Sequence, residues 1–293
     1  MTVLSKVILT DKPKGITSRK WDDAVQKALH LTKTGHVGTL DPMATGLQII
    51  LSGRATRLLQ YFIDGTKRYE AEVTFGLSTD TWDTEGQTVK ELATFTMPDL
   101  KTIENTLDTF RGPITQTPPP HSAIKVEGKP MYYWTRKGIH KLAPPREVEV
   151  YSIDNTTVSN NTVSFSISCS KGTYIRSIAN ELGQKLGLPS HLSALRRTEI
   201  GPFSTASIDS TIEIPHVLLS PFEALSLLYP TVEVPDPLVP AITNGRTPDI
   251  PELLTLPDTT LFLLHTSDTL LAVCERTTTA PTGYKLRTVY PAQ

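Results

Sequence analysis

The chain has 293 residues, of which 38 % are hydrophobic and 20 % charged, and its formal net charge is −1. These values are ordinary for a soluble globular protein and predict about two domains. The sequence contains no apolar run approaching the roughly 18 residues of a membrane span, and its N-terminus lacks an apolar leader. We therefore expect a cytoplasmic protein with no membrane partner.

The cysteines and histidines give no sign of a disulfide framework or a metal site. Cys169 and Cys274 are the only cysteines, they lie far apart, and no Cys-x-x-Cys occurs. The seven histidines also lack the spacing of metal ligands. No metal is expected.

The first predicted element is a helix from about Ser18 to His30. Ser18 can cap this helix, and Trp21, Val25 and Leu29 recur on one face at helical spacing. Five further elements follow in chain order: a buried strand over 47–51, a half-buried strand over 69–75, a helix over 100–110 capped by Asp99, a strand over 163–169 and a helix over about 174–186.

A glycine-flanked turn precedes the first of these strands and carries one carboxylate, Asp41. Gly35, Gly38 and Gly46 tolerate backbone angles that other residues avoid, and Pro42 favours an extended Asp41. Such a loop can present a carboxylate at the edge of a site with little freedom, as a nucleophile requires. An isolated Asp-Pro more often only begins a turn, so the loop alone does not decide between these interpretations.

The charge is unevenly distributed along the chain. Residues 111–146 contain seven Lys and Arg but the single acid Glu127, a local charge of +6, interleaved with Tyr132, Tyr133 and Trp134. This pattern predicts a projecting arm that binds a phosphate backbone, with an ordinary solvated face as the alternative. Residues 231–293 instead carry four basic and seven acidic residues and contain short strand-like runs, which predict a small β domain with little phosphate contact.

Arg176 is the second chemical candidate, because a cation that begins a helix lies at the unfavourable end of the helix dipole. A carboxylate or phosphate partner would explain this position, whereas a partly solvated arginine is the simpler alternative.

Several ordered motifs resemble the bacterial TruB-type tRNA pseudouridine synthases. The resemblance spans roughly residues 8 to 203. Its motifs are Lys12-Pro13-x-Gly15-x-Thr17-Ser18, Gly35-His36-x-Gly38-Thr39-Leu40-Asp41-Pro42-x-Ala44-x-Gly46, Gly53-x-Ala55-Thr56, Lys67-Arg68-Tyr69, Thr79-Asp80-Thr81-x-Asp83-x-x-Gly86, Pro118-Pro119-x-x-Ser122-Ala123-x-Lys125, Cys169 to Arg176, and Leu195-Arg196-Arg197.

The resemblance implies an α+β pseudouridine synthase fold. Its parts would be a central mixed, largely antiparallel sheet flanked by helices, an RNA-binding insertion and a small C-terminal β domain of the PUA-like kind. Residues 1–230 would form the catalytic domain, with the arm at about 111–146, and residues 231–293 would form the PUA-like domain.

The family's functional residues carry over by position. Asp41 would be the catalytic nucleophile, Tyr69 the aromatic ring that stacks on the target uracil, and Arg176 the partner of the aspartate. His36, Tyr174 and Leu195 match positions that line the nucleotide pocket. Asp83 matches an acidic position near the pocket to which we assign no role. In the arm, the RNA contacts would come from Lys125, Lys129, Arg136 and Lys137.

The implied reaction converts uridine 55 in the T loop of tRNA to pseudouridine after the base leaves its stack. It breaks the C1′–N1 bond, turns the uracil over and joins C5 to C1′ with loss of the C5 proton, so no cofactor is expected. Asp41 could attack C1′, add to C6 or assist a sugar deprotonation. A charged Arg176 nearby should lower the pKa of Asp41.

Two alternatives stay open from the sequence. The catalytic subunit of a guide-RNA pseudouridine synthase has a similar aspartate loop, but the basic arm favours a stand-alone enzyme that grips the T-arm of tRNA itself. We therefore expect no guide RNA, and a monomer. A non-catalytic tRNA-binding protein is the other alternative, which the joint presence of Asp41, Tyr69 and Arg176 disfavours.

Overall fold

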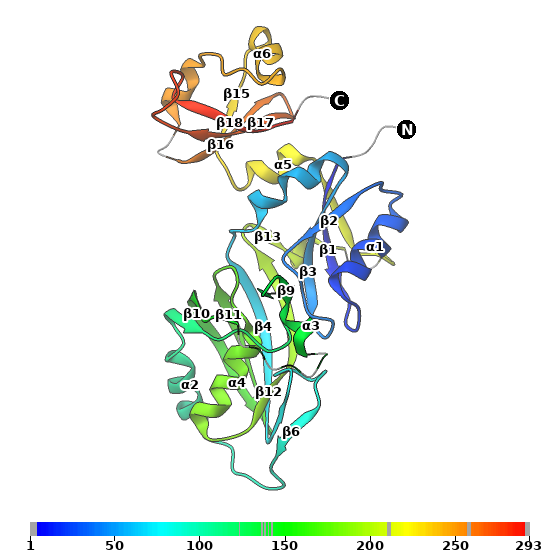
Figure 1. Ribbon diagram of the computed structural model, residues 1–293, viewed down its shortest axis with the longest axis vertical. Helices are drawn as coiled ribbons and strands as arrows, with labels where there is room; N and C mark the ends of the chain where they lie inside the picture. Colours follow the sequence, from blue (N-terminus) through cyan, green and yellow to red (C-terminus); the bar gives the residue numbers. More distant parts are fainter. Residues whose placement is uncertain are drawn as a thin grey trace.

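The computed structural model describes residues 5–290 apart from 123, 136, 138, 140, 142, 210–211 and 257–258. A large sheet fills the lower and middle parts of the molecule in Figure 1, and a smaller C-terminal sheet lies at the top. No helix among the described residues is long and apolar enough to cross a membrane.

The large sheet is mixed and largely antiparallel, as the sequence predicted. Its strands are β1 (Val7–Lys12), β2 (Thr34–Val37), β3 (Thr45–Ser52), β4 (Lys67–Phe75), β7 (Gly112–Gln116), β10 (Arg146–Ser159), β11 (Thr162–Cys169), β12 (Ser190–Ile200), β13 (Phe203–Ser204) and β14 (His216–Leu219). The order across the sheet is β14-β1-β3-β12-β4-β11-β10-β7, with β2 beside β3 and β13 beside β12. Only the join between β3 and β12 is parallel among these pairings. It places the two halves of the sheet side by side.

Helices and short hairpins surround this sheet. The helices are α1 (Ser18–Ala28), α2 (Leu100–Asp108), α3 (Met131–Thr135), α4 (Ile175–Leu186), α5 (Pro221–Ser226) and α6 (Val239–Thr243), and the 3-10 turns are η1 (Gly53–Phe62), η2 (Thr205–Ser207), η3 (Asp236–Leu238) and η4 (Pro251–Thr255). The hairpins pair β5 (Leu77–Thr79) with β6 (Thr88–Glu91) and β8 (Lys125–Val126) with β9 (Lys129–Pro130).

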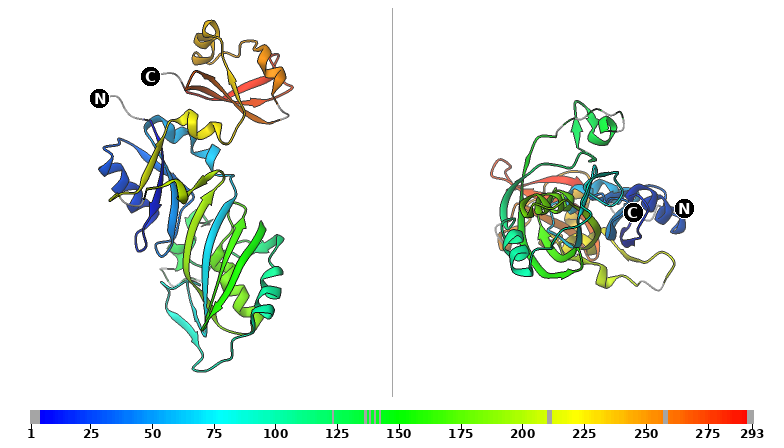
Figure 2. Two further views of the ribbon diagram at one scale, coloured as in Figure 1. Left: turned by 180° about the vertical axis from the view of Figure 1, so that it is seen from behind. Right: turned by 90° about the horizontal axis from the view of Figure 1, so that it is seen from below.

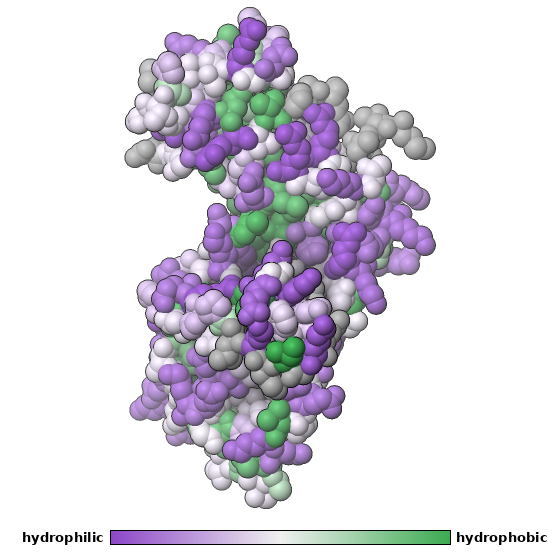
Figure 3. Space-filling view, viewed as in Figure 1, coloured by the Kyte–Doolittle hydropathy of each residue, from purple (hydrophilic) through white to green (hydrophobic). Residues whose placement is uncertain are grey.

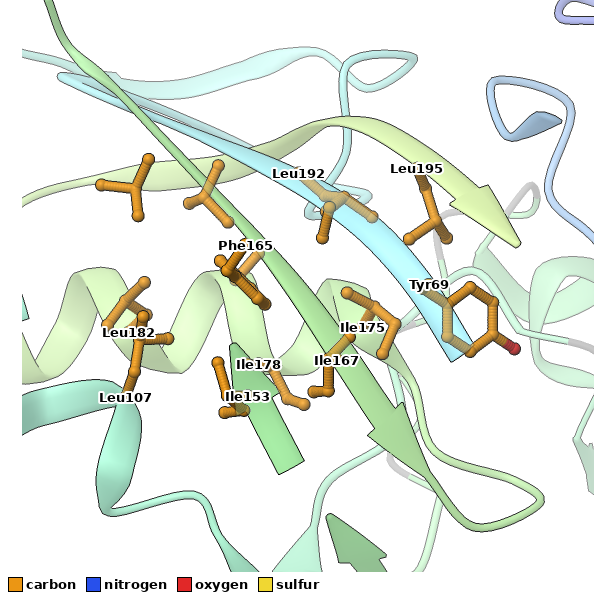
Figure 4. Close-up of a cluster of buried hydrophobic side chains, with 14 of the residues drawn as sticks. Tyr69, Leu107, Ile153, Phe165, Ile167, Ile175, Ile178, Leu182, Leu192 and Leu195 are labelled. Atoms are coloured by element: carbon orange, nitrogen blue, oxygen red, sulfur yellow. The ribbon is translucent and has the colours of Figure 1, made fainter. Parts of the chain in front are cut away.

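The main core lies between α4 and the strands β4, β11 and β12. Figure 4 shows Phe165 and Leu192 of the sheet facing Ile178 and Leu182 of the helix. The alternation predicted for residues 69–75 is confirmed, because the odd-numbered side chains from Tyr69 to Phe75 are buried. Figure 2 shows the other face of these strands from behind.

The helix boundaries are close to the predicted ones, with one change at the first helix. Asp99 caps α2 as expected, since its Oδ1 accepts a hydrogen bond from the amide of Thr102 at 2.7 Å. The cap of α1, however, is Thr17 and not Ser18. Thr17 Oγ1 accepts from the amide of Lys20, which frees the Ser18 hydroxyl for another contact described below.

The first residues of the segment predicted as the arm belong to the large sheet. Residues 112–116 form β7, an edge strand of the large sheet paired with the beginning of β10. Arg111 donates to Asp108 and to the carbonyl of Ile153, so it belongs to the sheet edge as well. The projecting segment therefore begins after Gln116, where the chain leaves the sheet.

The C-terminal part has its own sheet of four strands. These are β15 (Thr231–Glu233), β16 (Leu261–Thr266), β17 (Thr269–Arg276) and β18 (Tyr284–Val289), in that order. One face covers a separate core that includes Val232, Phe262 and Tyr284. The other face joins Leu263 and Val273 to the core beneath α5, so the small sheet is packed against the large part of the molecule.

Candidate active site

A pocket opens at the end of the main core, where β4, β12 and the start of α4 meet the loop that holds Asp41. Its lining residues are Gly38, Thr39, Leu40, Asp41, Lys67, Tyr69, Gly172, Thr173, Tyr174, Ile175, Arg176, Leu195 and Arg197. Five residues predicted from the sequence for the catalytic and base-binding roles lie together here: Asp41, Tyr69, Tyr174, Arg176 and Leu195.

The Asp41 loop is held by the segment that begins α1. The amide of Leu40 donates to Ser18 Oγ at 2.8 Å. The Ser18 hydroxyl also lies 3.1 Å from the carbonyl oxygen of Leu40. The amide of Gly15 and the Lys12 ammonium both donate to the carbonyl of Pro42, at 2.8 and 3.4 Å. The backbone on both sides of Asp41 is therefore fixed by residues of the N-terminal motif.

Two glycines, Gly38 in this loop and Gly46 at the start of β3, are required by close contacts and backbone angles. Gly46 has φ +104°, and a Cβ there would lie 2.2 Å from the carbonyl oxygen of Arg197. Gly38 has φ +64°, and a Cβ there would lie 3.3 Å from Nη1 of the Arg197 side chain. The predicted role of glycine thus applies to these positions, whereas Gly35 lies within β2 and has no positive φ.

Arg176 lies between two carboxylates. Its Nη2 donates to Asp41 Oδ1 at 3.1 Å, and its Nε lies 3.0 Å from Asp41 Oδ2. Its Nη1 lies 3.3 Å from Asp83 Oδ2, on the opposite side of the guanidinium. The carbonyls of Thr81 and His121 accept further hydrogen bonds at 3.2 and 2.9 Å. These contacts fix the arginine in a buried position, and they fix the carboxylate of Asp41 through it.

The pKa of Asp41 is raised above its ordinary 3.8, which corrects the direction predicted from the sequence. Burial is the largest cause, and the negative charge of Asp83 acts in the same direction. Arg176 lowers the pKa as expected, but its effect is smaller than that of burial. The sequence revealed the cation, while the depth of the carboxylate depends on the folded structure.

Tyr69, Tyr174 and Leu195 give the pocket its apolar surfaces. Tyr69 comes from β4 and lies at the end of the hydrophobic cluster, where its hydroxyl points away from the apolar side chains (Figure 4). Leu195 comes from β12 and is 8 % exposed. Tyr174 precedes α4, and Gln116 fixes its backbone through hydrogen bonds of 2.7 and 3.0 Å. Rings and an aliphatic side chain in this arrangement can hold a planar base.

His36, the remaining predicted pocket residue, lies outside the pocket lining. It is on β2, where Nδ1 lies 3.5 Å from Asp22 Oδ2 and Nε2 lies 3.4 Å from Thr39 Oγ1. Because Thr39 itself lines the pocket, His36 is one residue removed from it.

In the arm beyond Gln116, lysine ammonium groups lie over an aromatic side chain. Tyr133 lies under the ammonium groups of Lys137 and Lys129, at 4.6 and 5.6 Å from the ring centroid. Trp134 donates to the carbonyl of Val126 at 3.0 Å, which ties α3 to the β8–β9 hairpin. In the space-filling view, hydrophilic side chains gather over this part of the molecule (Figure 3).

Three of the four predicted RNA contacts of the arm are among the described residues. Lys125, Lys129 and Lys137 all belong to this segment, whereas Arg136 lies outside the described residues. Among the described residues, no group of three or more His, Cys, Asp or Glu side chains is arranged to hold a metal ion.

Sequence reasoning assigned no role to several residues that build the site. Asp83 is buried and holds Arg176, and Lys12 donates to the carbonyls of Pro13 and Ile16 as well as Pro42. Burial lowers the pKa of Lys12 to about 8. Charged residues within otherwise structural motifs were the available signal, but their partners are distant in the sequence.

The overall fold has counterparts among solved structures. The chain is similar to the crystal structure of a Cbf5–Nop10–Gar1 complex, with a TM-score of 0.69 and 24 % identity, covering 97 % of this chain and 84 % of that one. The archaeal box H/ACA Nop10–Cbf5 complex gives a TM-score of 0.67 at 22 % identity. These similarities define the fold class.

Sequence comparison identifies the family within that class. Residues 26–175 match the TruB family pseudouridylate synthase N-terminal domain. The chain is 37 % identical over 263 residues to tRNA pseudouridine synthase B of Bacillus pumilus, covering 85 % of each chain. It is 39 % identical over 251 residues to the protein of that name from Azoarcus, covering 83 % of each. The chain belongs to the TruB family of pseudouridine synthases.

Proposed function

We propose that this protein isomerises uridine 55 in the T loop of tRNA to pseudouridine, with Asp41 as the catalytic nucleophile. The observation that carries the proposal is the contact of Arg176 with both oxygens of Asp41, at 3.1 and 3.0 Å, in a pocket that Tyr69 also lines. The curated relatives named tRNA pseudouridine synthase B supply the substrate class.

The pocket's residues fit the chemistry of this isomerisation. The target base must leave its stack before a carboxylate can reach it, and the ring of Tyr69 can then hold the uracil. Arg176 keeps the carboxylate of Asp41 in one orientation and favours its ionised form. From this position Asp41 can attack C1′, add to C6 or assist a deprotonation at the sugar. The reaction is redox-neutral and intramolecular, so it calls for no cofactor.

Tyr174 and Leu195 complete the nucleotide pocket in this proposal. Their side chains line the space around Asp41 from the start of α4 and from β12. His36 would contact the RNA beside the pocket through its neighbour Thr39.

The arm would bind the phosphates of the T-arm. Lys125, Lys129, Arg136 and Lys137 would supply the positive charge, and an enzyme with its own grip on the T-arm needs no guide RNA. We propose that it works as a cytoplasmic monomer. Because the segment after Gln116 leaves the sheet edge, it can close over a bound RNA without disturbing the strands beneath.

The proposed function is tested with unmodified tRNA labelled with tritium at uracil C5. Formation of the C5–C1′ bond releases this tritium into water, so the wild-type protein should release one tritium per tRNA. A tRNA with cytidine in place of uridine 55 and label at its other uridines is the matched control and should release none. Equal release from both substrates would contradict the assignment of position 55.

A further inference from the structure

The residues that lead from the large sheet into the arm are attached to the first turn of α4. We call residues 116–121 the arm root. Gln116 is the last residue of β7 and is 1 % exposed. Pro118 and Pro119 are buried as well, so the chain packs against the body of the protein before it reaches the β8–β9 hairpin. The arm root therefore belongs to the framework around the pocket, although in the sequence it lies within the basic segment.

The side-chain amide of Gln116 contacts both backbone groups of Tyr174. Oε1 accepts a hydrogen bond from the Tyr174 amide at 2.7 Å, and Nε2 donates to the Tyr174 carbonyl at 3.0 Å. The same carbonyl accepts from the amides of Ser177 and Ile178, at 3.1 and 3.3 Å, as α4 begins. Tyr174 is the N-cap of α4, and its own side chain makes no capping hydrogen bond. The contacts with Gln116 thus fix the point from which the helix starts.

Two further hydrogen bonds join the arm root to the same helical turn. Ser177, whose side chain is buried, donates from Oγ to the carbonyl of Thr117 at 2.7 Å. Arg176 donates from Nη2 to the carbonyl of His121 at 2.9 Å. The arm root therefore holds α4 at three neighbouring residues, while Ile175 of the same turn packs into the main core.

This attachment bears on the orientation of Arg176 toward Asp41. Arg176 follows Tyr174 by two residues, and its guanidinium contacts the two carboxylate oxygens of Asp41 at 3.1 and 3.0 Å. Backbone hydrogen bonds make one helical turn stiff, so a shift of Tyr174 would carry Arg176 with it. A displacement of about 1 Å at a catalytic group can slow a reaction by about 100-fold. Gln116 can therefore control the pair through the backbone of Tyr174.

We propose that Gln116 is a positioning residue, which sets the start of α4 so that Arg176 meets Asp41. The inference rests on the proposed function and extends the framework of the active site to the segment that leads into the arm. A change at Gln116 should reduce the rate of the chemical step, whereas changes of the cations further along the arm should reduce tRNA affinity. The competing interpretation is that Gln116 contributes only to the stability of the fold.

Gln116→Met distinguishes these roles, because methionine has a similar length but neither forms the contact with the Tyr174 amide nor donates to its carbonyl. Single-turnover tritium release at saturating enzyme should fall by about 10- to 100-fold, and tRNA affinity should change less than about threefold. Circular dichroism at the assay temperature verifies that the variant is folded. A folded variant with a rate within about twofold of wild type would overturn the proposal. A loss found only in affinity would overturn it as well.

Gln116→Glu tests the two-point contact even if Gln116→Met does not fold. An ionised carboxylate accepts from the Tyr174 amide but sets a second oxygen against the Tyr174 carbonyl, whereas a protonated carboxyl group supplies an acceptor and a donor as glutamine does. Burial beside a carbonyl oxygen favours that protonated form. The rate of Gln116→Glu relative to wild type should therefore rise by about fivefold or more from about pH 8 to about pH 5.5. A ratio that stays constant or falls would overturn the proposal.

Thr115→Ala is the matched control on the same strand. Thr115 is exposed, and its Oγ1 donates to Glu147 Oε1 at 2.6 Å, away from α4. Its replacement should leave the rate within about twofold of wild type. Equal losses in Thr115→Ala and Gln116→Met would assign the effect to β7 as a whole and overturn the proposal. Absence of any wild-type release would instead contradict the proposed function itself.

Discussion

The pocket and the arm hold their positive charges in opposite ways. Arg176 is 5 % exposed in its side chain and contacts two carboxylates and two carbonyls. Lys137 of the arm is exposed and lies over an aromatic ring. Chemistry at one atom requires a group held in a single orientation, whereas a phosphate backbone is bound by charge at many compatible distances. Changes in the pocket should therefore reduce the rate, and changes in the arm should reduce affinity.

The largest effect is expected from Asp41→Asn. The amide preserves the shape of the side chain but removes the nucleophilic charge, so single-turnover tritium release should fall by about 10⁴-fold or more. Binding of tRNA, measured by filter retention, should change less than about threefold. Release near the wild-type rate would remove Asp41 from the chemistry and end the contrast between pocket and arm.

The next effect is expected from Arg176→Lys. Lysine keeps the charge but cannot contact Asp41 and Asp83 at once with a planar fork, so the rate should fall by about 100-fold with little loss of affinity. A loss found only in affinity would place Arg176 with the arm, as a general phosphate contact.

A smaller effect, and a shift in pH dependence, is expected from Asp83→Asn. Asp41 must be ionised to act as a nucleophile, so the rate falls as the pH drops through its raised pKa. Asp83 contributes to that rise by its negative charge. Its neutralisation should lower the pKa of Asp41 and move the acid limb of the rate profile to lower pH. The maximal rate should fall by about tenfold, because Arg176 loses one of its partners.

The measurement is a single-turnover rate profile for wild type and Asp83→Asn over the same acidic range. An acid limb that moves to higher pH in the variant would contradict the electrostatic role given to Asp83. Circular dichroism at each pH controls for unfolding of the variant.

The smallest effect on chemistry is expected from the arm. A variant in which four arm cations are replaced by glutamine should keep the wild-type single-turnover rate at saturating enzyme. Its tRNA affinity should depend less on salt, with the slope of log affinity against log salt changed by roughly 3 units. The replaced residues are Lys125, Lys129, Arg136 and Lys137.

The matched control replaces four exposed lysines elsewhere on the surface, Lys20, Lys27, Lys90 and Lys101. Its salt slope should stay close to that of wild type. Equal slopes for wild type and the arm variant would show that the arm is a structural excursion and that another surface holds the RNA.

The sequence alone predicted the elements whose side chains repeat with a clear period. The alternation over 69–75 identified β4, and the apolar stripe over 174–186 identified α4, because local periodicity reflects one buried face. The motifs also named Asp41, Tyr69 and Arg176, which lie in one pocket.

Only the tertiary structure decided how distant segments meet. The cap of α1 moved from Ser18 to Thr17 because the Ser18 hydroxyl is engaged by Leu40 of the Asp41 loop. Residues 112–116, which lie within the predicted arm, pair with the beginning of β10 at the edge of the large sheet. Neither competition is visible in the local sequence.

The electrostatics of the site show the same division. The sequence placed a cation near Asp41, and the geometry confirms their contact. The sign of the pKa shift of Asp41, however, depends on burial and on Asp83. Asp83 is 42 residues further along the chain and contacts Arg176 from a different loop. Spacing in a sequence identifies chemical groups, whereas desolvation and hydrogen-bond direction exist only once the chain has enclosed them.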